Sequence, residues 1–70
     1  MVNVDKLIGA LFSKGYNKGS FAEALGKRQS WLSGKLKKKN FTLEEADEIV
    51  RVLKLDAKEA TEIFFSQFVA

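Results

Sequence analysis

The chain has 70 residues and contains no cysteine, no histidine and no proline. Without cysteine it forms no disulfide framework and no thiolate metal site, and without histidine it lacks the commonest metal ligand and neutral-pH proton carrier. No apolar run approaches the roughly 20 residues of a membrane-spanning helix, and polar residues interrupt the N-terminal stretch, unlike in a signal peptide. We therefore expect no cofactor, no metal, no membrane contact and a reducing, cytoplasmic location.

The short length limits the chain to one small domain, which we place over residues 1–70. Apolar residues recur at helical spacing in five segments, and neither proline nor a long polar linker interrupts them. The sequence therefore predicts an all-α fold, a compact bundle of about five short helices. We expect, in order, a helix over about residues 3–14 that ends before Gly15, one from a cap at Asn17 to Gly26 and one over about residues 29–38. A fourth helix is expected to start from a cap at Thr42 and to carry Leu53, and a fifth to start from a cap at Asp56 and to carry Phe64.

Two of the expected helices begin with the spacing of a capping box. Thr42 and Glu45 are placed so that each side chain accepts a hydrogen bond from the backbone N–H of the other, and Asp56 and Glu59 repeat this arrangement. Phe41 precedes the first box at the position of a hydrophobic staple. Acidic residues near a helix start are favoured by the helix dipole. We interpret these acids as capping charges, and we do not expect an enzyme.

Positive charge is concentrated in the first part of the chain. Residues 1–39 carry nine lysines and arginines against two acids, whereas residues 40–70 carry three against seven. Six of the positive charges fall within residues 27–39. A basic front and an acidic rear orient a protein towards a polyanion. A solvated lysine face is also common in small proteins, so charge alone leaves both interpretations open.

Residues 17–39 have the layout of a short helix, a glycine corner and a second helix that ends in lysines. Ala22 is a small residue where two helices would nearly touch, and Gly26 is free to adopt a positive φ at the corner. Leu32 is an apolar anchor on the second helix. This spacing is that of a helix-turn-helix motif, and it favours DNA binding.

The residues at the motif positions are Phe21, Ala22, Leu25, Gly26, Leu32 and Ser33. With them the chain resembles the phage repressor and Cro-like helix-turn-helix family. The resemblance covers essentially all 70 residues, because five short helices with the reader formed by the second and third are the plan of that lambda-repressor-like fold. It implies a regulator of transcription, a repressor of phage or prophage type, in the cytoplasm of a bacterium or phage-infected cell. Its third helix would enter the major groove of a double-stranded DNA operator.

The third expected helix departs from the family pattern at two places. Lys35 stands where a second apolar anchor is common, and Leu36 takes that position one residue later. Arg28 stands where a serine or threonine usually caps the helix. Either the helix begins without a side-chain cap, or Ser30 is the cap and the helix begins further along the chain.

With Leu32 and Leu36 facing the core, the polar residues of the third helix face outward. Glutamine pairs with adenine, serine pairs with several base edges, and a glycine lets backbone and groove approach closely. We expect base contacts from Arg28, Gln29, Ser30, Ser33, Gly34 and Lys37. Phosphate contacts require only charge or a donor at an approximate position, and we expect them from Asn17, Lys18, Lys27, Lys35, Lys38 and Lys39.

Aromatic residues at helical or staple positions are expected in the core or at its edge, namely Phe12, Tyr16, Phe21 and Phe41. Trp31 has two interpretations. It lies at the core rim, where it covers the junction of the second and third helices, or it presses against a sugar or a thymine methyl group of DNA.

The C-terminal segment holds more apolar area than one face of a short helix buries. Ile63 and Phe64 follow earlier apolar residues at helical spacing and are core candidates. We expect a two-fold homodimer contact, at least on DNA, from Phe65, Phe68 and Val69. The alternative is that the tail folds back over the first helix and closes the core of its own subunit.

A second function class stays open beside DNA binding. A protein-interaction domain on the same fold, such as an antirepressor or antitoxin-like partner, would use the aromatic tail or the acidic second half of the chain. RNA binding predicts a platform of exposed stacking aromatics, and the sequence offers none. Sequence-dependent binding to duplex DNA separates the first two classes.

Overall fold

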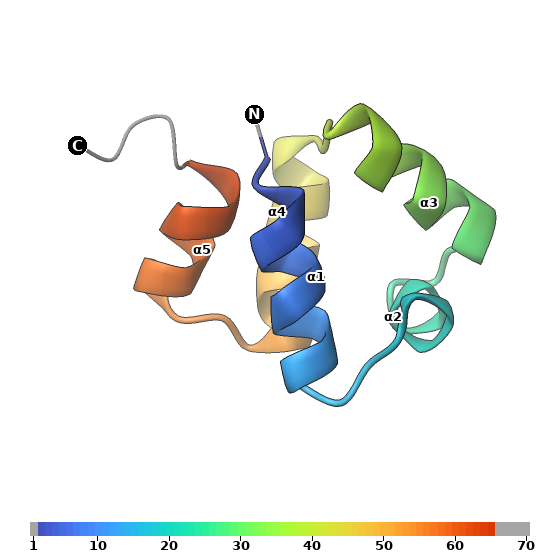
Figure 1. Cartoon of the computed structure of the whole chain (residues 1–70), viewed down its shortest axis with the longest axis horizontal. Helices are drawn as coiled ribbons and strands as arrows, with labels where there is room; N and C mark the ends of the chain where they lie inside the picture. The colour runs from blue at the N-terminus through green and yellow to red at the C-terminus, as the bar shows by residue number, and fades with distance from the viewer. Residues whose placement is uncertain (1, 66–70) are drawn as a thin grey trace.

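The computed structural model describes residues 2–65, and all regular structure in that range is α-helical (Figure 1). The predicted all-α fold of about five short helices is confirmed for the described residues. No helix in this range is long and apolar enough to cross a membrane. The helices, in chain order, are α1 (Val4–Ser13), α2 (Lys18–Ala24), α3 (Gln29–Lys38), α4 (Leu43–Leu53) and α5 (Ala57–Phe64).

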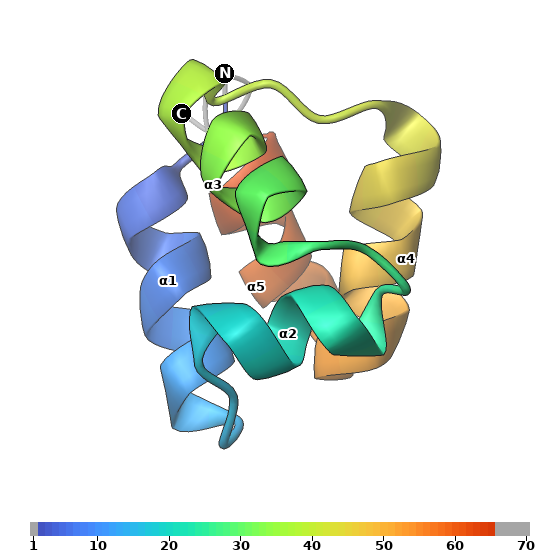
Figure 2. The ribbon, with the colours of Figure 1, turned by 90° about the vertical axis from the view of Figure 1, so that its right-hand side faces the viewer.

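The five helices surround a shared core. α1 and α5 pack side by side (Figure 1), and α2 packs against α3. In Figure 2, α1 and α4 lie on either side, α5 lies behind, and α2 with α3 forms the side towards the viewer. The helix pair that the sequence identified as a helix-turn-helix therefore lies together at the surface of the molecule.

The core is a single cluster of apolar side chains contributed by all five helices. Among the described residues no polar or charged side chain is buried, so every such group can reach solvent or a ligand. Leu55, in the short link between α4 and α5, belongs to the cluster although sequence analysis did not single it out. The buried residues are Leu7, Leu11, Phe21, Ala22, Leu25, Leu32, Leu36, Ala46, Ile49, Leu53, Leu55, Ile63 and Phe64.

Sequence analysis predicts Phe12 in the core or at its edge, and this prediction is wrong because the side chain is 54% exposed. Leu7 and Leu11 are the α1 residues that the core buries. Phe12 is rotated by about 100° from Leu11 around the helix axis, so it points away from the side that α1 buries. Helical spacing alone therefore predicted an apolar face of α1 that is wider than the face that α1 buries against the other helices.

The other aromatic predictions are confirmed. Phe21 is fully buried, and the half-buried ring of Tyr16 meets it edge-on with the ring centroids 5.8 Å apart. Phe41 is half-buried and meets Phe64 edge-on at 6.3 Å. Edge-to-face geometry at this separation is the favoured arrangement of aromatic pairs.

Capping boxes fix where α4 and α5 begin, as predicted. Thr42 Oγ1 accepts a hydrogen bond from the Glu45 N–H at 3.1 Å, and Glu45 Oε1 accepts one from the Thr42 N–H at 2.8 Å. Asp56 and Glu59 exchange the same pair of hydrogen bonds, at 2.8 and 3.2 Å. These side chains satisfy backbone N–H groups that the first turn of a helix leaves without partners.

Left-handed residues follow the ends of four helices. Gly15 and Gly26, with φ of 92° and 72°, occupy the positions predicted for them after α1 and α2. Lys39 and Lys54 follow α3 and α4 with φ of 54° and 53°, which the sequence did not indicate. A side chain in this conformation costs about 1 kcal/mol, so tertiary packing holds these two residues in place.

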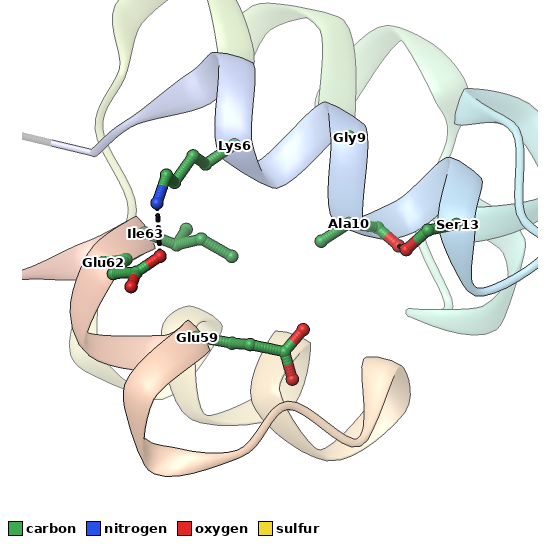
Figure 3. A pocket seen from close by; sticks show the side chains of 7 residues that line it. All are labelled: Lys6, Gly9, Ala10, Ser13, Glu59, Glu62 and Ile63. Carbon is green, nitrogen blue, oxygen red and sulfur yellow. Dashed lines mark hydrogen bonds and ion pairs between the residues drawn. The ribbon is translucent and has the colours of Figure 1, made fainter.

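The junction of α1 and α5 is joined by polar contacts. Lys6 forms an ion pair with Glu62 (Figure 3). The Asn3 N–H donates a hydrogen bond to the Ile63 carbonyl at 2.7 Å. The hydrogen bond from Lys6 holds the pKa of the Glu62 carboxyl below its ordinary value. A hollow of about 180 Å³ lies beside this ion pair, between the two helices. These contacts fix the start of α1 against the end of α5.

Replacing Gly26 by alanine is expected to lower the free energy of unfolding by about 1 kcal/mol. An added Cβ would meet no atom within 4 Å, so the loss reports the strain of a side chain at φ +72° alone. Gly34→Ala is the matched control, because Gly34 lies inside α3 and its Cβ would also meet nothing within 4 Å. This second variant should be more stable by up to about 1 kcal/mol. Urea unfolding measures the free energy of unfolding of both variants. If this free energy changes in the same direction in both, the Gly26 corner is not strained by a side chain.

Candidate nucleic-acid interface

A tight turn joins α2 to α3 and sets the angle between them. The Lys27 N–H donates to the Ala22 carbonyl at 2.9 Å, and Gly26 between them adopts the left-handed conformation that this bond requires. Ala22 and Leu32 are buried against the core. The three residues that defined the motif in the sequence therefore occupy their predicted places, and α2 and α3 form a helix-turn-helix pair (Figure 2).

The start of α3 resolves the choice between Arg28 and Ser30. Arg28 is the extended residue before the helix, with φ −84° and ψ 154°, and its side chain makes no capping hydrogen bond. Ser30 lies inside the helix, which begins at Gln29. α3 therefore begins without a side-chain cap, and its first backbone N–H groups depend on solvent or a ligand for partners.

The rotation of α3 follows from its two buried residues. Leu32 and Leu36 face the core, which confirms that Leu36 takes the anchor position in place of Lys35. All six residues predicted to contact bases consequently lie outside the core, Gly34 half-buried and the other five exposed: Arg28, Gln29, Ser30, Ser33 and Lys37.

The structure brings Gln29 close to the first turn of α2. A Cβ on Gly19 would lie 3.3 Å from Gln29 Oε1 and 3.4 Å from Asn17 Oδ1. Asn17 caps α2 as predicted, and it does so in a full capping box with Ser20, at 2.8 and 2.9 Å. The small residue at position 19 thus leaves room for Gln29, a predicted base-contact residue, beside the first turn of α2.

A hollow of about 280 Å³ runs along one side of α3. Gly34 contributes to it, because no atom lies within 4 Å of the place its side chain would take. The hollow continues past the end of the helix and gives a ligand access to the helix backbone. It is lined by Ser30, Trp31, Gly34, Lys35, Lys38 and Asn40.

Trp31 lies at the rim of the core, which agrees with the first of the two interpretations of this residue. Its half-buried ring packs against the core cluster and also lines the hollow. The Nζ atoms of Lys27 and Lys35 lie 5.4 and 5.7 Å from the ring centroid. Both distances are within the range of cation–π attraction, so one aromatic ring positions two ammonium groups.

Lys35 is also bound to an acid of the neighbouring helix. Its Nζ lies 2.8 Å from Glu45 Oε1, in a pair whose side chains are 24% and 20% exposed. Burial raises the pKa of the Glu45 carboxyl, but hydrogen bonds from Lys35 and the Thr42 N–H, with the positive charge of Lys35, outweigh it and leave the pKa below its ordinary value. Sequence analysis missed this pair because nothing local links residues ten apart on different helices.

The remaining residues predicted to bind phosphate lie around both ends of α3. Lys18 is the half-buried first residue of α2. Lys27 precedes α3, Lys38 is its last residue and Lys39 follows it, and all three are exposed. These positive charges therefore lie on or next to the helix-turn-helix pair whose second helix, α3, carries the predicted base contacts.

The predicted dimer contact falls partly within the described residues. Ile63 and Phe64 are buried as predicted, and Phe65 is 41% exposed. Phe68 and Val69 lie outside the described residues. Phe65 forms one wall of an apolar hollow of about 220 Å³ between α4 and α5, and Leu43, which is 76% exposed, forms another.

Comparisons of the chain with protein-family models, with curated proteins and with solved structures found no match. The resemblance to repressor and Cro-like proteins thus depends on the motif residues quoted above. The function has to be inferred from the geometry and charge of the chain itself.

Proposed function

We propose that the chain is a sequence-specific regulator of transcription, a repressor of phage or prophage type that inserts α3 into the major groove of double-stranded DNA. The observation that carries the proposal is the division of α3 into two sides. Leu32 and Leu36 hold one side in the core, and the exposed positions carry only polar and basic side chains. A helix with its side chains is about 10–12 Å across, which matches the roughly 12 Å width of the major groove.

The proposed contacts divide into those that read sequence and those that position the protein. Gln29 and Ser30 stand in the first turn of α3, where family members read base edges, with Arg28 just before them. Ser33, Gly34 and Lys37 extend this surface by one to two turns. The backbone contacts proposed are those of Asn17, Lys18, Lys27, Lys35, Lys38 and Lys39.

The proposed activity is binding without catalysis and without a cofactor. A repressor of this type acts where the DNA is, in the cytoplasm of a bacterium or phage-infected cell. Its operator would be double-stranded DNA. The rival class of function is a protein-interaction domain, and the exposed apolar hollow at Leu43 and Phe65 favours that class. Binding to duplex DNA that depends on its sequence separates the two.

The first test is the salt dependence of binding to duplex DNA. If each subunit neutralises about four to six phosphates, log affinity should fall against log salt with a slope of about −3.6 to −5.4. Fluorescence anisotropy of a labelled duplex pool across a salt series measures this slope. A protein that binds no duplex even at low salt would rule out the proposal.

A pair of matched variants tests whether the end of α3 meets phosphate. Lys39 and Lys54 share one left-handed conformation, so Lys39→Gly and Lys54→Gly each remove one charge and a similar strain, and both should gain about 1 kcal/mol of stability. Only Lys39→Gly should weaken DNA binding several-fold and reduce the salt slope by about 0.9. Equal losses would mean that net charge alone attracts DNA.

Specificity is tested with Gln29→Ala after a binding site has been selected from random duplexes. The variant should lose about 1 to 3 kcal/mol on the selected site and little on random DNA. Lys38→Ala is the control, because loss of a phosphate contact weakens both alike. Equal loss on both DNAs for Gln29→Ala would show that Gln29 positions the protein and does not read bases.

The homodimer is part of the proposal, at least on DNA, with Phe65, Phe68 and Val69 as its contact. Phe65 lies within the described residues and is 41% exposed. Phe65→Ser should reduce dimer mass or operator affinity in sedimentation. Phe12→Ser, at another exposed phenylalanine and one outside the apolar hollow, should change neither. One subunit per site with no effect of Phe65→Ser contradicts the dimer.

A further inference from the structure

We propose that the Glu45 carboxylate occupies the place of a DNA phosphate at the junction of α3 and α4, and limits DNA affinity by holding Lys35 until a phosphate oxygen replaces it. This inference rests on the proposed function. It deepens that function by identifying a built anion site and the internal anion that competes for it.

The site is built around one aromatic ring. The ammonium groups of Lys27 and Lys35 both lie within 6 Å of the Trp31 ring centroid. Two like charges beside one ring repel each other, and a nearby anion relieves this repulsion. Glu45 supplies that anion, with its Oε1 2.8 Å from Lys35 Nζ. A phosphodiester also offers oxygen acceptors and a single negative charge, so it satisfies the same donors.

The partial exposure of this ion pair makes an exchange of anions feasible. Lys35 and Glu45 are 24% and 20% exposed, whereas the side chains of the pair Arg51–Asp47 are 77% and 58% exposed. Water therefore screens the Lys35–Glu45 pair less, and its contribution is larger than that of a fully exposed pair. The hollow along α3 has Lys35 and Lys38 in its lining, so a DNA backbone lying in it would reach the ammonium directly.

Glu45 has a second task that keeps it in place when Lys35 leaves. Its Oε1 also accepts the Thr42 N–H at 2.8 Å in the capping box of α4. The exchange therefore requires rotation of the Lys35 side chain and no change in the helices. In this arrangement one carboxylate stabilises the start of α4 and restrains a DNA-binding lysine.

The test compares Glu45→Gln with Glu44→Gln. Glutamine at position 45 keeps the capping box, because it also serves at that position, but it loses the charge that holds Lys35. Glu44 is the neighbouring acid in the first turn of α4 and pairs with no lysine or arginine among the described residues. Both variants change the net charge equally. At about 0.1 M salt, Glu45→Gln should bind duplex DNA about three- to fivefold more tightly than Glu44→Gln, and the ratio should approach one as salt rises.

A third variant shows whether the increase in DNA affinity of Glu45→Gln depends on Lys35. In a Lys35→Met background, which keeps an apolar stem without the ammonium, the two glutamine substitutions should change affinity equally. Trp31 is the only tryptophan, so its emission reports the site directly in the wild-type protein. Addition of duplex DNA should change that emission with the same midpoint as the anisotropy signal.

The outcomes separate this inference from the proposed function. If the wild type binds DNA but Glu45→Gln equals Glu44→Gln, or if Trp31 emission does not respond to bound DNA, the inference is overturned and DNA binding stands. If the wild type binds no duplex at low salt, both are overturned. A larger gain for Glu45→Gln that disappears with Lys35→Met supports the exchange of carboxylate for phosphate.

Discussion

The left-handed conformation of Gly26 sets the angle between α2 and α3, and the rest of the candidate interface depends on that angle. Because the chain reverses there, Ala22 is buried where the two helices meet and Leu32 reaches the core. Once that leucine is buried, the direction of every other α3 side chain is fixed by helix geometry. The proximity of Gln29 to the start of α2 follows from the same turn. One backbone conformation thus determines which polar groups face outward together.

α3 itself contains little that favours a helix in isolation. It begins without a side-chain cap, contains Gly34 in its interior and ends beside a lysine in a strained conformation. Its stability therefore comes from tertiary packing, through two buried leucines, as is general for short helices. Residues that are unfavourable for local helix stability are expected at functional sites, where contact with a ligand matters more than stability. In the proposed function, Gly34 opens the hollow and Lys39 carries charge. Contact with DNA would therefore explain the loss of helix stability at both positions.

Features of the fold that depend on nearby residues were predictable from the sequence. The Thr42 and Asp56 caps and the Gly26 corner are encoded by residue types within three or four positions, so the starts of α4 and α5 and the end of α2 followed from them. The exposed Phe12 and the buried Leu55 were missed, because both depend on how far neighbouring helices extend over a surface. At the candidate site, the sequence left the rotation of α3 open between Lys35 and Leu36, and the burial of Leu36 decides it. The partners of Trp31 were not predictable from the sequence, because they join side chains through space.

Charge along the chain differs from charge in space. The sequence divides into a basic part, residues 1–39, and an acidic part, residues 40–70, yet three of the four ion pairs within the described residues join one part to the other. Lys6 and Lys14 pair with acids of α5, far along the chain from the lysines around α3. Of the six charges clustered at residues 27–39, Lys35 is the one that pairs with an acid within residues 2–65, which the structure describes. Folding thus uses part of the basic charge to hold helices together. In the proposed function, Glu45, which pairs with Lys35 beside α3, also weakens attraction to phosphate that does not depend on DNA sequence. In the proposed complex, base contacts then supply a larger share of the affinity, which is what discrimination between sequences requires.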